Sequence, residues 1–269
     1  MASSLVLSSS MTTSKRYVAT SSKPSLKSAP TIERTALSTV QIPEYLNRVY
    51  WWAYIHPNAV KFFERQWLAD AILFGNYAKL RDAALQELLE ENTGKMGGKT
   101  LQVACAYGDL TPTLASRLAP SASLDVVDVA PIQIKNLQQK LDSTQARVQL
   151  GLQNADNLGF DNKSMDQVLF FFLLHEIPLD VREKALEEAW RVCKPGGKIV
   201  FVDYHKPASY SPHRYLMPIV LQTLEPFAMD MWRQEISEWL PKDAAVDGIR
   251  KDTYFGGLYQ KVVITKQKE

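Results

Sequence analysis

Hydrophobic runs alternate with amphipathic stretches along the chain from residue 99 onward. Five runs are apolar enough to form strands of a buried sheet, at 101–106, 123–129, 147–155, 164–174 and, after the Lys-Pro-Gly-Gly turn of 194–197, up to 205. Helix-like stretches separate the first strand from the second, the second from the third and the fourth from the fifth, at 111–119, 131–142 and 180–193. Strands that alternate with helices at this spacing predict a parallel sheet with right-handed crossovers.

The last part of the chain departs from this rhythm. Residues 207–243 contain five prolines and many large apolar side chains, and they are too long for a simple connection, so we expect a helical insert that forms a lid. Residues 252–266 predict two antiparallel strands joined around Gly256 and Gly257. The expected fold class is therefore α/β, with a Rossmann-like, mostly parallel sheet that ends in an antiparallel hairpin, which is the outline of a class I methyltransferase-like fold.

A pair of helices is expected ahead of the sheet, over 41–90, with a break at Pro57. Aromatic side chains crowd the first part of this region, and charges are interleaved with them at helical spacing. The helices can pack on the following domain as a cap, or they can cover an apolar substrate or a membrane surface. Since 92–99 predicts a turn, we expect an N-terminal helical cap over 41–98 and an α/β domain over 99–269.

The first 40 residues differ in composition from the rest. They are rich in Ser and Thr, they carry five Lys or Arg and one acid, Glu33, and they lack the long apolar core of a secretory signal. This composition predicts a transit peptide, mitochondrial in preference to plastid, although the many serines leave the plastid open. The remaining residues carry 26 basic and 28 acidic side chains, a balance that argues against bulk binding of nucleic acid.

Ligands bind in open α/β sheets beyond the carboxyl ends of the strands, and the first such end is unusual. It holds one glycine, Gly108, which lets the backbone approach a ligand closely. We expect Ala104, Cys105 and Gly108 to contact the ligand. Asp109 can accept a hydrogen bond from a ligand ammonium group or cap the helix that follows, and the sequence leaves both roles open.

Acidic residues also follow the second and third strands. Asp128, followed by Val129, stands about 20 residues after the first loop, where nucleoside-binding folds place a carboxylate that accepts both ribose hydroxyls. A helix cap is the alternative role for Asp128. Around the third strand end, NADNLGF resembles the ADAxxLPF stretch of methyltransferases that bind S-adenosylmethionine. On that resemblance Asp156 accepts from the adenine amino group, and the backbone N–H of Asn157 approaches the ring.

Longer matches make the resemblance more specific. They are YWWAYIHPNAVKFFERQWL (50–68), LFGNYAKLRD (73–82), VACAYGDLTP (103–112), VDVAPIQIKNL (127–137) and FFFLLHEIP (170–178). The chain resembles the ubiquinone/menaquinone C-methyltransferases, and within that neighbourhood it more closely resembles the RquA-type family of rhodoquinone biosynthesis. Methyltransferases commonly carry ExGxGxG in the first loop, whereas RquA-type sequences carry a VACxYGDLT-like loop, as this chain does.

The resemblance implies a change of reaction on the same fold. RquA-type proteins convert ubiquinone to rhodoquinone, replacing a ring methoxy group with an amine, with S-adenosylmethionine as the nitrogen donor and with Mn²⁺. Since the amino-acid end of the cofactor lies over the first loop, we expect Tyr107 and Asp109 to orient that end and to keep its amine deprotonated. A quinone C- or O-methyltransferase is the alternative, and a non-catalytic subunit of the quinone pathway is a third interpretation.

His and acidic residues follow the fourth and fifth strands. Imidazole and carboxylate together suit Mn²⁺, so we assign Asp203 and His205 as ligands and His175 as a general base or a further ligand. These residues can also be plain polar groups at strand ends. The aromatics of 45–75 and the insert are the expected walls for the apolar ubiquinone tail. The substrate also implies peripheral contact with the inner mitochondrial membrane, on its matrix side.

Overall fold

The computed structural model describes residues 41–90, 94–141 and 147–268, so the transit peptide predicted for 1–40 lies outside the described residues. Within this part the sheet has seven strands in the order β3-β2-β1-β4-β5-β7-β6. Their bounds are β1 Lys99–Val103, β2 Ser123–Asp128, β3 Val148–Leu152, β4 Met165–Phe171, β5 Cys193–Tyr204, β6 Val246–Tyr254 and β7 Tyr259–Lys266. Strands β1 to β5 pair in parallel, and β7 pairs antiparallel with β5 and β6. The predicted sheet and its C-terminal hairpin are confirmed.

Three helices connect the parallel strands where the sequence predicts them, namely α5 Leu110–Ser116, α6 Pro131–Lys140 and α7 Leu179–Val192. Helix α6 begins with Pro131, whose missing N–H is harmless in the first turn. The central strands are covered on both faces, and this explains their continuous apolar sequence. Leu101, Val168 and Phe201, on three adjacent strands, are fully buried.

The N-terminal region is more broken than the predicted pair of helices. It consists of α1 Glu44–Val49, a π-helical turn η1 Trp51–Ile55, α2 Pro57–Phe63, α3 Gln66–Ile72 and α4 Tyr77–Leu88. The predicted break at Pro57 is confirmed. A break that the sequence analysis missed lies at Phe74 and Gly75, which have φ of 52° and 74°. This left-handed conformation cannot continue a right-handed helix, so α3 ends before it.

The insert after β5 is helical, as predicted. It contains α8 His213–Leu224 and two 3₁₀ helices, η3 Ala228–Trp232 and η4 Ile236–Trp239. The following strand β6 begins at Val246, earlier than the predicted start of the hairpin at 252. Within the described residues, no helix combines the length and the apolar run that would be needed to cross a bilayer.

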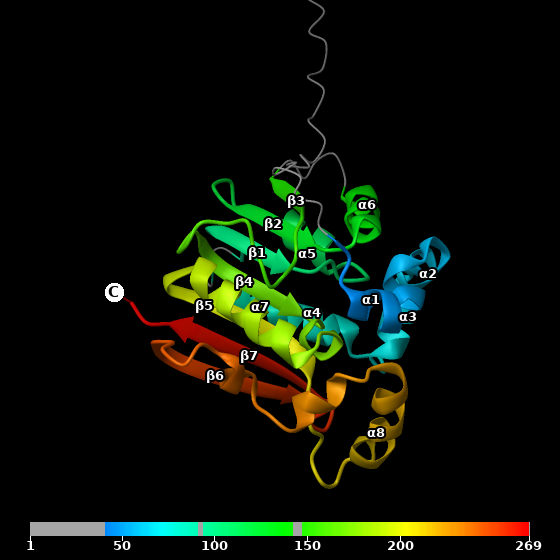
Figure 1. Ribbon diagram of the computed structural model, residues 1–269. Coiled ribbons are helices and arrows are strands. Elements are labelled where there is room, and N and C mark those ends of the chain that lie inside the picture. The colour runs from blue at the N-terminus through cyan, green and yellow to red at the C-terminus, as the bar shows by residue number, and fades with distance from the viewer. Residues whose placement is uncertain (1–40, 91–93, 142–146, 269) are drawn as a thin grey trace, which may run out of the picture.

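The N-terminal helices lie beyond the carboxyl ends of the parallel strands. A small apolar cluster of Leu46, Tyr50 and Ala130 joins α1 to the loop that follows β2. The ring of Phe227, in the insert, packs at 6.4 Å from the ring of Tyr45 and at 6.5 Å from that of Tyr50. Figure 1 shows α1, α2, α3 and α8 gathered at the edge toward which the parallel strands point. Any site at this edge is therefore covered by cap and insert together.

Candidate functional site

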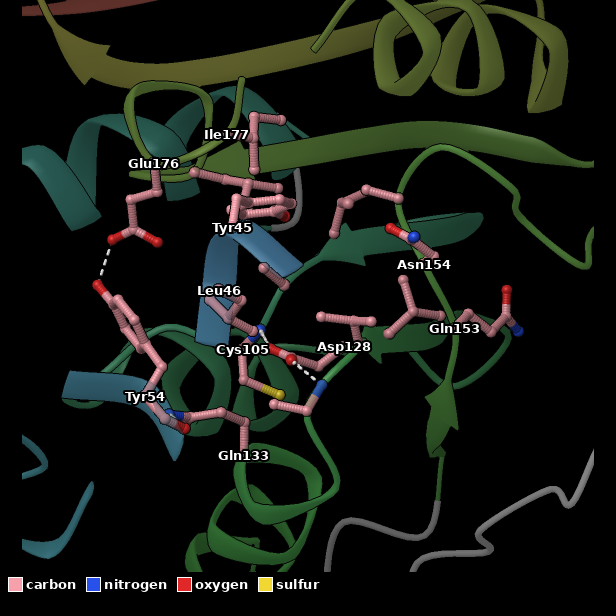
Figure 2. A pocket seen from close by; sticks show the side chains of 17 residues that line it. Tyr45, Leu46, Tyr54, Cys105, Asp128, Gln133, Gln153, Asn154, Glu176 and Ile177 are labelled. Atoms are coloured by element: carbon pink, nitrogen blue, oxygen red, sulfur yellow. Dashed lines mark hydrogen bonds between the residues drawn. The ribbon is translucent and has the colours of Figure 1, made fainter. Parts of the chain in front are cut away.

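A cavity lies at the carboxyl ends of β1 to β4, beneath α1 (Figure 2). This is the edge of the sheet at which the sequence predicts a ligand. Its floor and walls come from the strand ends at 103–105, 127–130 and 153–155 and from the loop after β4, which contributes Leu173, Glu176 and Ile177. The cap contributes Tyr45, Leu46 and Tyr54, and α6 contributes Gln133.

The cavity lining includes four of the seven residues predicted to hold the cofactor, namely Ala104, Cys105, Asp128 and Val129. The other three are described in the structure but lie outside the lining: Gly108, Asp156 and Asn157. Gln153 and Asn154 line the cavity at the third strand end. The NADNLGF motif thus reaches the cavity, but through Asn154 and Ala155 and not through the predicted Asp156 and Asn157.

Asp128 ties the first two strand ends together. Its Oδ2 accepts a hydrogen bond from the backbone N–H of Cys105 at 2.8 Å, and its Oδ1 accepts one from Ala130 at 2.8 Å. Burial raises the pKa of Asp128 to about 6, with these hydrogen bonds opposing the rise. Each carboxylate oxygen has a second lone pair, so the loop-tying role is compatible with the predicted contact to a ribose.

Tyr107 and Asp109, the predicted catalytic residues of the first loop, make contacts with the cap. The Tyr107 hydroxyl donates to the carbonyl of Ala53 at 2.6 Å, and the Tyr107 ring stacks on that of Tyr54 at 5.5 Å. Asp109 forms an ion pair with Arg81 at 2.6 Å and makes no capping bond to α5. Neither residue belongs to the cavity lining. Their geometry therefore indicates that they position the cap, not that they touch the reacting atoms.

A buried acid–base cluster forms the wall of the cavity beside β4 and β5. His175 and Glu176 belong to η2, a 3₁₀ turn over Leu174–Glu176. His175 Nδ1 lies 2.8 Å from Asp203 Oδ1, and His175 Nε2 lies 3.6 Å from Glu176 Oε1. Glu176 also accepts a hydrogen bond from the hydroxyl of Tyr54, drawn in Figure 2. Glu176 and Tyr54 line the cavity, so the chain of contacts from Asp203 ends at its surface.

Burial and the neighbouring charges shift the pKa values of His175 and Glu176. Burial alone would lower the pKa of His175, but the charge and hydrogen bond of Asp203 raise it to about 9. Burial raises the pKa of Glu176, and the positive charge of His175 opposes this rise only in part. A carboxyl group with a raised pKa can donate as well as accept a proton near neutral pH. Glu176, which the sequence analysis did not select, is therefore the acid–base group that reaches the cavity, and His175 stands behind it.

A buried arginine holds this turn in place. Arg182, on α7, is fully buried and donates to the carbonyl of Leu174 at 2.9 Å and to that of Ile177 at 3.0 Å. It also donates to Phe227 in the insert at 3.2 Å, and its guanidinium lies 4.4 Å from the ring centre of Trp239. Since this one buried side chain binds the carbonyl groups at both ends of η2 and also contacts the insert, α7 and the insert together hold the turn that carries Glu176.

The predicted metal ligands do not fit a manganese site. Asp203 is 1% exposed, and its oxygens accept from the backbone N–H of Leu174 and of Tyr204 besides contacting His175. His205 Nδ1 lies 2.8 Å from the carbonyl of Gly257. In the described ranges, no group of three or more His, Cys, Asp or Glu side chains is arranged to hold a metal ion. Asp203, near the end of β5, therefore pairs with His175, in contrast to its predicted role as a metal ligand.

Comparison with known proteins matches this architecture to one family. Residues 100–197 match a family described as a methyltransferase domain. The demethylmenaquinone methyltransferase of Geobacillus sp. strain WCH70 is 30% identical over 167 residues, which cover 59% of this chain and 68% of that relative. The chain belongs to the ubiquinone/menaquinone C-methyltransferase family. The ubiquinone/menaquinone biosynthesis C-methyltransferase UbiE of Idiomarina loihiensis is 28% identical over 117 residues, 43% of this chain and 46% of the relative.

A solved structure of a SAM-dependent methyltransferase from Methanosarcina mazei shares the fold. It is 17% identical, with a TM-score of 0.52, and the match covers 69% of this chain and 97% of that one. Membership of the ubiquinone/menaquinone C-methyltransferase family makes this chain a transferase of the methyltransferase superfamily and supports S-adenosylmethionine as its cofactor. The predicted resemblance to this family is confirmed. The narrower resemblance to RquA-type proteins stays a prediction.

Proposed function

We propose that this enzyme converts ubiquinone to rhodoquinone by exchanging a ring methoxy group for an amino group, with S-adenosylmethionine as the nitrogen donor. The curated relatives, named for menaquinone and ubiquinone, support a quinone substrate. The first loop, VACAYGD, supports the exchange, since it resembles the RquA-type loop and lacks the repeated glycines common in methyltransferases. The composition of residues 1–40 supports a mitochondrial location, and the quinone supports the matrix side of the inner membrane.

The observation that carries the proposal is the acid–base cluster that opens on the cavity through Glu176. In the first part of the exchange, a bond forms between the amine nitrogen of the cofactor and the ring carbon, and the bond from that carbon to the methoxy oxygen breaks. A later step must break the bond between this nitrogen and the carbon skeleton of the cofactor, which leaves the amino group on the ring, and we assign no residue to that later step. In the first part, two protons move. The nitrogen must lose a proton, and the departing oxygen must gain one to leave as methanol. Glu176 can accept the first proton and supply the second, because burial raises its pKa. The His175–Asp203 pair behind it stabilises the ionised form that appears between the two transfers.

The other cavity residues have roles that follow from their chemistry. Asp128 is suited to hold the ribose of the cofactor, and Gln133 and Asn154 supply further polar groups to the cavity. Tyr45 and Leu46 provide an apolar roof for the quinone ring. The resemblance implies manganese, but because Asp203 and His205 do not fit it, we assign no step to a metal.

Quinone methylation is the second candidate, and membership of the C-methyltransferase family favours it. Methyl transfer to the ring of a hydroquinone also needs a base, since a hydroxyl proton must leave as the ring carbon attacks the methyl group. Glu176 would serve there too. The two reactions therefore share a site but differ in product, and product analysis separates them.

The test incubates the purified full-length protein with ubiquinone and S-adenosylmethionine labelled with heavy nitrogen in its amino group, with and without Mn²⁺. We expect mass spectrometry to find a quinone that has lost one methoxy group and gained a labelled amino group. Because the ubiquinone ring is already fully substituted, a parallel reaction uses a demethylated quinol with a free ring position. A product of that reaction that has gained a methyl group, with S-adenosylhomocysteine, would establish methylation instead. The Glu176→Gln variant is expected to bind the cofactor normally but form product at least about a hundredfold more slowly. Glu183→Gln, an exposed change on α7, is the matched control.

A further inference from the structure

Helix α8 presents a row of large apolar side chains to solvent. Tyr215 is 67% exposed, Leu216 is 61% exposed and Ile219 is 71% exposed, and Val220 and Leu224 extend the same surface. The buried side of the helix needs only Met217 and Leu221 to pack on the rest of the insert. Exposed apolar side chains are normal when scattered, but a contiguous group marks an interaction surface.

The N-terminal cap continues this surface. Its exposed aromatic side chains are Trp51, Trp52, Phe62, Trp67 and Phe74. Phe74, in the turn after α3, lies 5.4 Å from the ring of His213 at the start of α8, so cap and helix adjoin. Figure 1 shows α2, α3 and α8 on the same side of the molecule, beyond the strand ends that bear the cavity. The exposed apolar residues of α8 and of the cap are called the docking surface below.

The exposed charges beside the docking surface are mainly basic, and Asp70, on α3 between Trp67 and Phe74, is half-buried. Residues 204–224 contain no Asp or Glu. In the fully described segments 51–67 and 206–224, the exposed charged residues are Lys61, Arg65 and Lys206. The acid of this region, Glu64, is withdrawn from the surface by an ion pair with Lys140 at 2.6 Å. Aromatic and aliphatic side chains bordered by Lys and Arg are the combination that binds at the headgroup region of an anionic bilayer.

We propose that the docking surface seats this enzyme on an anionic membrane. The reason for such docking rests on the proposed function, because an enzyme seated on the membrane could take a lipid quinone directly from the bilayer into the cavity. A second copy of the chain is a poorer occupant, because a symmetric contact would bring the same basic residues face to face. None of the exposed residues of the docking surface belongs to the cavity lining, so docking and chemistry can be tested separately.

The experiment is flotation of the full chain with vesicles of phosphatidylcholine, with and without phosphatidylglycerol. We expect binding to the anionic vesicles, weakened by salt. Ile219→Glu should lower the partition coefficient by at least about tenfold, since it removes one large apolar group from the contact. Lys61→Glu should lower binding to anionic vesicles and leave binding to neutral ones unchanged. Ile249→Glu is the matched control, because Ile249 is 51% exposed on β6 and outside the docking surface.

The proposal is overturned if Ile219→Glu floats like the unmodified protein, or if Ile249→Glu is equally impaired. It is also overturned if Ile219→Glu leaves flotation unchanged but converts a dimer to a monomer in analytical ultracentrifugation. All variants should bind S-adenosylmethionine with unchanged affinity in calorimetry and act normally on a short-tailed quinone in detergent. If the unmodified protein floats but never alters a quinone, the proposed function fails and the docking assignment stands.

Discussion

Replacing Asp203 with Asn tests the charge balance on which the cluster depends. The pKa of His175 is raised from its ordinary value of 6.5 to about 9 in the folded protein. A group whose pKa is higher in the folded state stabilises the fold when protonated. This contribution is fully present below pH 6.5 and is lost as the pH rises through about 9. Without the charge of Asp203, the largest influence that raises the pKa of His175 is lost, and only Glu176 and Glu225 still oppose the effect of burial. The pKa of His175 therefore falls, and most of this stabilisation disappears.

The magnitude follows from the same values. A pKa raised from 6.5 to about 9 corresponds to about 3 kcal/mol of stability at the acidic end of this range. His175 is 5% exposed in its side chain, so solvent screens the pair little. A second loss does not depend on pH. Leu174 and Tyr204 donate backbone N–H groups to Asp203 at 2.9 and 2.7 Å. An amide offers a single acceptor oxygen, and one buried N–H left unpaired costs about 1–3 kcal/mol.

The assay is urea unfolding of both proteins at a series of pH values between 6.5 and 9. Asp203→Asn should be less stable by about 4–6 kcal/mol at the acidic end, and the gap should shrink to about 1–3 kcal/mol at the basic end. Asp166→Asn is the control. Asp166 pairs with Lys194 at 2.6 Å, and its pKa lies below its ordinary value of 3.8, so its contribution is constant over this range. A gap for Asp203→Asn that does not vary with pH would refute the reasoning.

Three further changes probe the supports of the site. Arg182→Met removes a buried donor from three carbonyl groups and should lower the free energy of unfolding by about 3–5 kcal/mol in urea titrations. Asp128→Asn leaves one of its two loop contacts without a proper acceptor and should raise the Kd for S-adenosylmethionine at least about tenfold in calorimetry. Tyr107→Phe and Tyr54→Phe should each slow quinone turnover about tenfold. The double variant should be no slower than Tyr54→Phe alone if Tyr107 acts only by positioning Tyr54, and additive losses would show a separate role.

The sheet was predictable because its signals are local. Apolar runs of strand length, a Pro at the start of α6 and the Lys-Pro-Gly-Gly turn before β5 each report on a few neighbouring residues. The breaks in the cap were less visible. Pro57 is a local signal for one of these breaks. The break at Phe74 has no such signal, because a bulky residue rarely adopts a positive φ. Tertiary contacts of the Phe74 ring with His213 and Phe255 accompany that conformation, and they come from more than a hundred residues away in sequence.

The position of the site was also predictable, since parallel strands end at one edge of the sheet. Which side chain reaches the ligand was not. His175 and Glu176 are adjacent in the sequence, and the general-base role was predicted for the histidine. The direction of each is set by Arg182, which binds both ends of the turn, and by Asp203, which holds the imidazole from the next strand. Neither contact leaves a local signature.

Asp203 illustrates the same limit for metal ligands. An acid and a histidine two positions apart at a strand end resemble a ligand pair, and spacing alone cannot separate that role from another. The decisive facts are the backbone N–H groups of Leu174 and Tyr204, which occupy the carboxylate, and the carbonyl of Gly257, which faces His205. A carboxylate so occupied has little capacity left for a cation but is well placed to keep a neighbouring imidazole charged. The charge of Asp203 therefore acts on the cavity chiefly through the proton that it holds on His175, since the positive charge of His175 lowers the pKa of Glu176 more than Asp203 raises it directly.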